Sequence, residues 1–212
     1  MQVLINFYKN NFYQFPQKIT LKGFFIILFV FSLVTGPFLP DLIVVITSII
    51  LIFNYKKIIL SIKQSKILQA LLVFLFYINF ASIFSEVPKE SFFSSLTFVR
   101  FLLFVIAINI FLLNTKYKNI IFFAFLILYS VLFFDSIYQI FNEHNIFKQV
   151  VGPTKRISSF FGDELIMGSF VARTFPIVLY LFFEADLKNK NFIYCYIVFI
   201  SLFCVIVSAE RT

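Results

Sequence analysis

Long runs of apolar residues, separated by short polar segments, fill the chain from about residue 21 onward. About seven of these runs are long enough to cross a bilayer, some with help from flanking residues, because about 20 apolar residues in a helix span the hydrocarbon core. They lie at about 21–39, 41–55, 67–84, 97–113, 119–141, 165–183 and 192–209. The second run is short, so it tilts little, extends past Tyr55 or forms a hairpin with the first run. The pattern predicts an all-α, polytopic bundle that forms a single membrane domain over residues 1–212.

The composition excludes a water-soluble protein. Hydrophobic residues make up 61% of the chain, 35 residues are Phe, and only 13% are charged. A soluble core of this length cannot bury so much apolar surface. The net charge of +8 does not indicate nucleic acid, because most lysines lie in short patches between apolar runs, where they orient spans and contact anionic lipids. We therefore expect membrane lipids, and no nucleic acid, as partners.

The polar segments alternate in charge, which predicts the topology. Eleven of the 18 basic residues fall on one side, namely Lys9, Lys18, Lys22, Lys56, Lys57, Lys63, Lys66, Lys116, Lys118, Lys188 and Lys190. By the positive-inside rule this side is cytoplasmic. The other side receives most of the acids, namely Asp41, Glu86, Glu90, Glu143, Asp163, Glu164 and Glu210. We expect a plasma-membrane protein with a cytoplasmic amino terminus, an outer loop at 142–164 and an outer Thr212.

All the arginines are predicted on the outer half, namely Arg100, Arg156, Arg173 and Arg211. The basic residues of the cytoplasmic side are lysines. The planar guanidinium suits phosphate oxygens, while lysine suffices for lipid anchoring. This segregation indicates an anionic, phosphate-bearing ligand on the outer side.

Arg173 is the most unusual of the four because it lies inside an apolar run. An ionisable group there costs about 2.5–3.5 kcal/mol on insertion scales, and such groups are usually functional. Helical spacing places Ser169, Arg173, Pro176 and Tyr180 on one polar stripe that should face the bundle interior. Gly168 and Ala172, on the adjoining face, admit a close helix neighbour.

Each charged candidate also has a purely structural interpretation. Asp135, near the outer end of its run, is a plausible partner for an outer arginine, and with Arg173 it would form a structural ion pair. Arg100 lies about one turn inside its run and has the alternative of snorkelling to the headgroups. Asp163 and Glu164 either cap the following helix or serve as acceptor ligands or a base.

The chain shows no pattern for a metal site or a disulfide. His144 has no Cys or His at ligand spacing, and its polar neighbours indicate a solvated side chain rather than a general base. Cys195 and Cys204 lie about 13 Å apart along a helix, too far for a disulfide. Residues 55–66 spread isoleucines among lysines, which predicts either amphipathic turns that lie on anionic lipid or a plain basic loop.

Three segments resemble a known family. Residues 156–170 read Arg-Ile-Ser-Ser-Phe-Phe-Gly-Asp-Glu-Leu-Ile-Met-Gly-Ser-Phe and precede Arg173 and Pro176, residues 210–212 read Glu-Arg-Thr, and residues 97–101 read Thr-Phe-Val-Arg-Phe. Over residues 95–212 the chain resembles the O-antigen ligase and polymerase family of bacterial envelope glycosyltransferases. Residues 156–176 are the most specific part, whereas residues 1–90 match only as generic spans.

The resemblance implies an inner-membrane enzyme that takes a glycan from undecaprenyl diphosphate on the periplasmic side. It would transfer this glycan to lipid A-core or to a growing polysaccharide, with no nucleotide, metal or other cofactor. Arg211 is similar to the arginine of the family's Gly-Glu-Arg-Thr motif, which faces the donor diphosphate, although Ala209 replaces the glycine. We expect Arg100, Arg173 and Arg211 to hold diphosphate charge, and Asp135, Asp163 and Glu164 to orient the arginines or the acceptor. The expected catalytic residues are Arg211, Arg173, Glu164 and Asp163, and the expected substrate-binding residues are Arg100, Arg156, Asp135 and Ser169.

The chain is shorter than members of this family, which carry further spans and a large periplasmic loop with a functional histidine. The chain is therefore expected to be the amino-terminal half of a longer protein, inactive alone. Two alternatives stay open: a transporter of an anionic or polyprenyl-linked solute, and a noncatalytic membrane partner of polysaccharide assembly. The pattern does not distinguish ligation from polymerisation or protein glycosylation.

Overall fold

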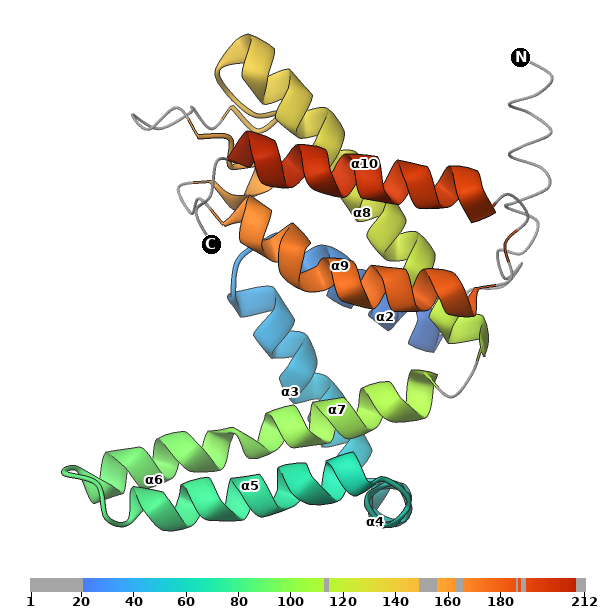
Figure 1. Cartoon of the computed structure of the whole chain (residues 1–212). Helices are drawn as coiled ribbons and strands as arrows, with labels where there is room; N and C mark the ends of the chain where they lie inside the picture. Colours follow the sequence, from blue (N-terminus) through green and yellow to red (C-terminus); the bar gives the residue numbers. More distant parts are fainter. Residues whose placement is uncertain are drawn as a thin grey trace. The chain divides into compact units, whose positions relative to one another are not determined.

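Helices account for almost all of the structure, a computed structural model that describes residues 21–112, 115–148, 156–162, 166–185, 187 and 190–208 (Figure 1). None of these residues lies in a β-strand, so the predicted all-α class is confirmed. The chain divides into two compact units: unit 1 comprises residues 1–39 and 115–212, and unit 2 comprises residues 40–114. The single membrane domain stays a prediction, and each unit is described by itself.

Unit 1 is built on an antiparallel hairpin of two long helices. These are α9 (Met167–Glu184) and α10 (Lys190–Ser208), which lie side by side in Figure 1. The longest helix, α8 (Thr115–Asn142), packs against both of them, and α2 (Leu21–Ser32) packs against α8. Large apolar side chains fill the core between these helices, among them Phe122, Leu132, Val178, Leu181, Ile197 and Ile200.

Hydroxyl groups join α8 to the hairpin of unit 1. The hydroxyls of Tyr129 and Thr174 lie 2.7 Å apart, and Tyr129 also donates to the Val171 carbonyl at 3.2 Å. On the α10 side, the Ser130 and Tyr196 hydroxyls are 2.9 Å apart. Such interhelical hydrogen bonds hold membrane helices together where hydrophobic attraction between helices is weak.

Unit 2 contains a second antiparallel hairpin. In it, α5 (Lys66–Ser82) runs against α6 (Pro88–Thr97) and α7 (Val99–Leu112), which follow one another in nearly the same direction (Figure 1). The helices α3 (Phe38–Ile52) and α4 (Tyr55–Gln64) complete the unit. Its core is a small apolar cluster of Leu51, Leu68, Ile106 and Ala107.

Four helical segments of the described chain are long and apolar enough to cross a membrane, or five if the bent pair α3 and α4 counts as one span. The four are Pro88–Ile110, Tyr117–Asn142, Met167–Glu184 and Lys190–Ser208, and each overlaps one of the last four predicted runs. Shorter apolar helices, Gly23–Ser32 and Lys66–Ser82, occupy the first and third runs. These helices identify a membrane protein, and the number of crossings stays a prediction.

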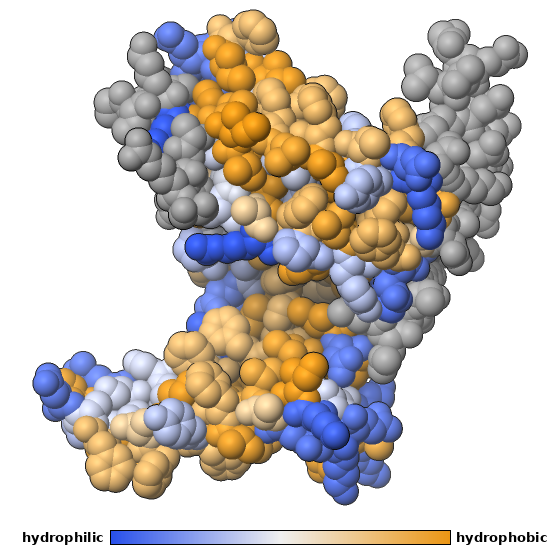
Figure 2. Space-filling model, in the orientation of Figure 1, coloured by the Kyte–Doolittle hydropathy of each residue, from blue (hydrophilic) through white to orange (hydrophobic). Residues whose placement is uncertain are grey.

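The surface supports the same conclusion, because large apolar side chains point outward along the helices. Phe76 in α5 is 71% exposed and Ile206 in α10 is 73% exposed. Contiguous apolar surface of this kind is suited to lipid rather than to water. In Figure 2, unit 2 shows a hydrophobic middle between two hydrophilic ends, as expected of a segment that crosses a bilayer.

The second predicted run ends in a sharp turn. The axes of α3 and α4 differ by 98° across a break at Phe53 and Asn54. Three lysines lie in α4, and each would cost about 2.5–3.5 kcal/mol inside hydrocarbon. We conclude that α4 does not continue the α3 span through the membrane core. The expected extension past Tyr55 is therefore a separate, redirected helix.

Candidate functional site

A buried polar cluster in unit 1 attaches the segment around Ser159 to the end of α8. Its centre is Ser159, in the short 3-10 helix η1 (Ser159–Phe161), which is fully buried. The Ser159 hydroxyl donates to Asp135 Oδ2 at 2.5 Å, and its backbone N–H donates to Gln139 Oε1 at 2.9 Å. The Ser159 carbonyl accepts from Asn145 Nδ2 at 2.8 Å. All three polar groups of Ser159 are therefore bonded to side chains that come from α8 or from the residues just after it.

Asp135 has a structural task in this arrangement. The residue is fully buried, and its second oxygen, Oδ1, accepts from the Ile146 N–H at 3.0 Å. The sequence suggested an outer arginine as its partner, but these partners are a hydroxyl and a backbone amide. A buried carboxylate is stabilised when such donors replace water. Asp135 thus bonds to two separate segments of the loop, and its predicted role in orienting an arginine or the acceptor stays a prediction.

The loop backbone around η1 is held in an uncommon conformation. Ser159 has φ +50°, and Gly162, directly after η1, has φ +62°. A side chain in the left-handed region costs about 1–2 kcal/mol, whereas glycine adopts it readily. The hydrogen bonds to Ser159 offset this cost. The Ser-Ser-Phe-Phe-Gly segment of the sequence is therefore a tight, anchored turn.

The turn also packs against the start of α9. The rings of Phe161 and Phe170 lie 5.3 Å apart, and the Ser136 hydroxyl of α8 contacts the Met167 sulfur at 3.3 Å. These contacts connect the loop, α8 and the first turn of α9 at one end of unit 1. Arg156 lies three residues before Ser159 and is half-buried.

The polar stripe predicted on α9 divides into buried and exposed positions within unit 1. Ser169 is buried and donates to the Ile166 carbonyl at 3.1 Å, whereas Arg173, Pro176 and Tyr180 are exposed. Gly168, on the adjoining face, is buried and Ala172 is exposed. Arg173 lies about 9 Å along the helix axis from the start of α9. It forms no ion pair or hydrogen bond with any residue in the described part of the chain.

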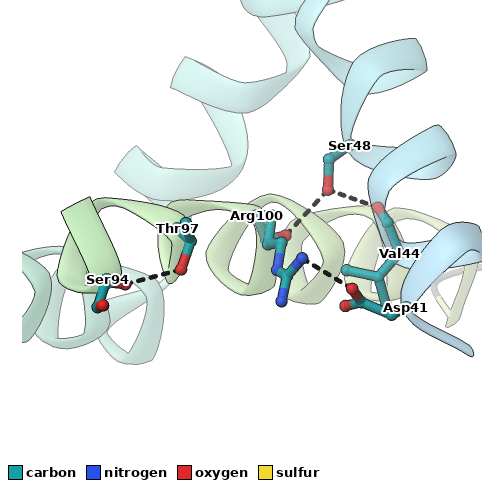
Figure 3. A network of polar contacts seen from close by, with 6 residues as sticks. All are labelled: Asp41, Val44, Ser48, Ser94, Thr97 and Arg100. Carbon is teal, nitrogen blue, oxygen red and sulfur yellow. Dashed lines mark hydrogen bonds and ion pairs between the residues drawn. The ribbon is translucent and has the colours of Figure 1, made fainter. Parts of the chain in front are cut away.

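Arg100 belongs to unit 2 and is paired there. Its Nη1 lies 2.8 Å from Asp41 Oδ2 (Figure 3). Its guanidinium carbon also lies over the Phe101 ring, 5.0 Å from the ring centroid. The Ser48 hydroxyl lies 2.9 Å from the Arg100 carbonyl and 2.7 Å from the Val44 carbonyl, so its hydrogen serves either acceptor. The pair joins the first turns of α3 and α7, since Asp41 is the acid of the first α3 turn.

The candidate span that contains Arg100 is longer than predicted. It begins at Pro88 rather than near residue 97, so Arg100 lies about 18 Å along it. The ion pair with Asp41, in which both side chains are part-exposed, gives this charge a local partner. Arg100 therefore contacts a second helix through Asp41. The predicted extension of its side chain to the lipid headgroups stays a prediction.

Several predicted site residues lie outside the described residues: Asp163, Glu164 and Arg211. Their roles stay predictions. His144 is part-buried, with Nδ1 lying 3.0 Å from the Asn145 carbonyl and its ring against that of Tyr138. No group of three or more His, Cys, Asp or Glu side chains suited to a metal ion occurs in the described part of the chain.

The sequence patterns did not indicate Ser159, the central residue of the cluster, or its hydrogen-bond partner Asn145. A signal was present, since an acid in an apolar run requires donors nearby, and Ser158 and Ser159 are polar residues directly before two aromatic residues. No family model, curated protein or solved structure matches this chain. The resemblance of residues 95–212 to the O-antigen ligase and polymerase family therefore stays a prediction.

Proposed function

We propose that this chain is a membrane domain of an O-antigen ligase-like or polymerase-like glycosyltransferase. In this proposal it binds a glycan linked to undecaprenyl diphosphate at the periplasmic face of the bacterial inner membrane. The acceptor is lipid A-core or a growing polysaccharide. The proposal includes seven crossings, a cytoplasmic amino terminus and an outer 142–164 loop, as the lysine distribution predicts.

The observation that carries the proposal is the environment of Arg173. This arginine lies on an exposed face of a helix that is long and apolar enough to cross a membrane, and no acid in the described part of the chain pairs with it. Such a charge is costly in lipid, and an anionic ligand at membrane depth would offset the cost. A diphosphate supplies oxygens that match the two-pronged guanidinium.

The anchored loop supports the proposal by fixing a second cation. Arg156 enters the turn whose Ser159 is bonded by Asp135, Gln139 and Asn145. Because the turn contacts the first turn of α9 through Phe161, the turn and the arginine-bearing helix lie together at one end of unit 1. Fixed cations stabilise the charge that develops on a leaving diphosphate without reorganisation during the reaction. We assign Arg156, Arg173 and Arg211 to this task, and Ser169, Asp163 and Glu164 to orienting the ligands.

Binding of undecaprenyl diphosphate to the chain in lipid nanodiscs tests the proposal, with undecaprenol as the uncharged probe. A hydrogen bond to a charged group is worth about 1.5–3 kcal/mol, so Arg173→Ala should weaken diphosphate binding about tenfold or more. Arg173→Lys should retain part of the affinity, because lysine keeps the positive charge but lacks the planar guanidinium that donates two parallel hydrogen bonds. Lys190→Ala, at an exposed lysine at the opposite end of the α9–α10 hairpin, is the matched control.

A cellular assay tests the enzymatic part. Because the chain is expected to be inactive alone, the assay uses a full-length version of the protein. In it, Arg173→Ala and Arg211→Ala should each abolish glycan transfer while the variants still insert into the membrane at normal levels. Transfer that persists in both variants would refute the assignment. Diphosphate binding without any transfer would instead support the noncatalytic partner.

A transporter of an anionic or polyprenyl-linked solute uses an intramembrane cation in the same way. The observation in its favour is the break between α3 and α4, since transporters build binding sites from interrupted helices. The lysines of α4 weaken this reading, because they keep that helix out of the membrane core. Accumulation of the intact lipid-linked solute across proteoliposomes, with no new glycosidic bond, would favour transport over glycosyl transfer.

A further inference from the structure

The inner face of helix α4 packs against other helices of unit 2. Ile58 and Ile62 contact the apolar cluster formed by Leu51, Leu68, Ile106 and Ala107. Through these contacts α4 lies against α5 and α7, at the end of unit 2 where α5 begins. The inner face fixes the rotation of α4 about its own axis, so the orientation of its other faces follows.

A neighbouring face of α4 has no contact of this kind. Lys56, Ile59, Leu60 and Lys63 follow the i, i+3, i+4, i+7 spacing that places residues on one side of a helix. All four are exposed, Ile59 by 50% and Leu60 by 56%. We call these four residues the α4 stripe. It combines two apolar side chains with a lysine at each end.

The direction of α4 favours a stripe that lies parallel to the membrane surface rather than one that enters the membrane. The helix turns by 98° from α3, and it is viewed nearly end-on in Figure 1 while α5, α6 and α7 run across the view. Figure 2 shows hydrophilic surface at this end of unit 2, next to its hydrophobic middle. If the α3 axis follows the membrane normal, α4 lies in the plane of the interface.

We propose that the α4 stripe binds the anionic phospholipid surface of the cytoplasmic leaflet. Ile59 and Leu60 enter the boundary between headgroups and acyl chains, and Lys56 and Lys63 extend their stems along it to lipid phosphates. Charge complementarity identifies the occupant, since residues 55–66 contain four lysines and no acid. Each lysine near an anionic membrane contributes about a fivefold preference. The inference does not depend on the proposed glycosyl transfer.

The absence of Trp from the sequence provides a direct test. Ile59→Trp introduces a single reporter into the stripe, and Gln64→Trp places the same reporter at an exposed position about 140° around the helix from Ile59. The full chain is reconstituted in vesicles of phosphatidylcholine, alone or mixed with phosphatidylglycerol, with brominated acyl chains as quencher. We expect strong quenching of Ile59→Trp, several-fold greater than that of Gln64→Trp, and a further increase when phosphatidylglycerol is present.

Removal of the lysines tests the charge contribution. Lys56→Gln together with Lys63→Gln should abolish the increase caused by phosphatidylglycerol. Lys89→Gln, which removes an exposed lysine from the first turn of α6, should leave that increase unchanged. If Ile59→Trp does not fold, Leu60→Trp reports from the next, slightly more exposed position of the same stripe.

Two results would overturn the inference. Quenching of the stripe reporter that does not exceed quenching of Gln64→Trp would mean that another part of the chain, or a protein, covers the stripe. Equal quenching with and without phosphatidylglycerol would mean that the stripe does not select anionic lipid.

Discussion

At the scale of single residues, Asp135 shows how a buried acid can organise a loop. The carboxylate lies in an apolar helix, where loss of water is costly, yet both of its oxygens accept hydrogen bonds from residues 11 and 24 positions later. These bonds connect Asp135 to one residue in each of the two described segments of the loop. The acid is therefore a structural requirement for whatever ligand the loop arginine binds.

Asp135→Ala should release the loop without unfolding α8. Each hydrogen bond to the carboxylate is worth about 1.5–3 kcal/mol, so the Ile146 amide, which loses its acceptor, should exchange with solvent about tenfold faster or more. The Ser159 amide donates to Gln139 instead, and it should also exchange faster because the Ser159 hydroxyl loses its bond to Asp135. Hydrogen exchange followed by mass spectrometry measures this change. Glu143→Ala, at an exposed acid just after α8, is the control and should leave both amides protected. Unchanged exchange in Asp135→Ala would show that the loop holds its place by other contacts.

The sequence was informative about which charged residues are unusual but not about their partners. Asp135 and Arg100 stand out because they interrupt apolar runs. Their partners, Ser159 and Asp41, lie 24 and 59 positions away, and no periodic pattern connects residues at such separations. A partner at that distance is set by tertiary packing, which a single sequence does not report.

At the scale of helices, hydropathy located the long apolar elements well and the short polar ones poorly. The predicted run at 97–113 omitted α6, because its Pro-Lys-Glu-Ser start is polar, although a proline in the first turn is a common helix start. The sequence of residues 55–66 was compatible with amphipathic turns or with a plain basic loop. The structure shows a helix, α4, so the plain loop is excluded. Packing against α5 and α7 stabilises this short helix, which would be marginal alone.

The contact between α8 and α9 depends on a tyrosine hydroxyl. Tyr129→Phe keeps the ring but removes the bonds to Val171 and Thr174, so stability should fall by about 0.6 kcal/mol, the average for such bonds between membrane helices. Thermal unfolding in detergent micelles measures the effect. Tyr138→Phe is the matched control on the same helix and should have no effect, since the Tyr138 hydroxyl forms no hydrogen bond with the described residues. Equal stability of both variants with the unaltered chain would contradict this assignment.

At the scale of the whole molecule, the sequence predicted the membrane class and the all-helical architecture, and the structure confirms both. It did not predict the division into two compact units. The helices have apolar residues on most sides, so their patterns do not say which helices pack together. The orientation in the membrane rests on the lysine distribution alone.

Cysteine labelling tests this orientation. In a background with Cys195→Ser and Cys204→Ala, Asn142→Cys lies at the exposed end of α8 and Lys57→Cys lies on exposed α4. In spheroplasts, a membrane-impermeant maleimide should label Asn142→Cys directly and Lys57→Cys only after permeabilisation. The opposite pattern would reverse the predicted topology, and labelling of both from outside would refute the alternation of charge on which it rests.

The anchor around Ser159 also bears on the order of events during synthesis. Its side-chain ligands Asp135, Gln139 and Asn145 all precede Ser159 in the chain, by 14 to 24 positions. The turn therefore has its bonding partners as soon as it leaves the ribosome, before α9 and α10 have emerged in full. The growing protein would present a closed turn to the emerging helix, and Phe170 of α9 would dock on the ring of Phe161, which is already in place.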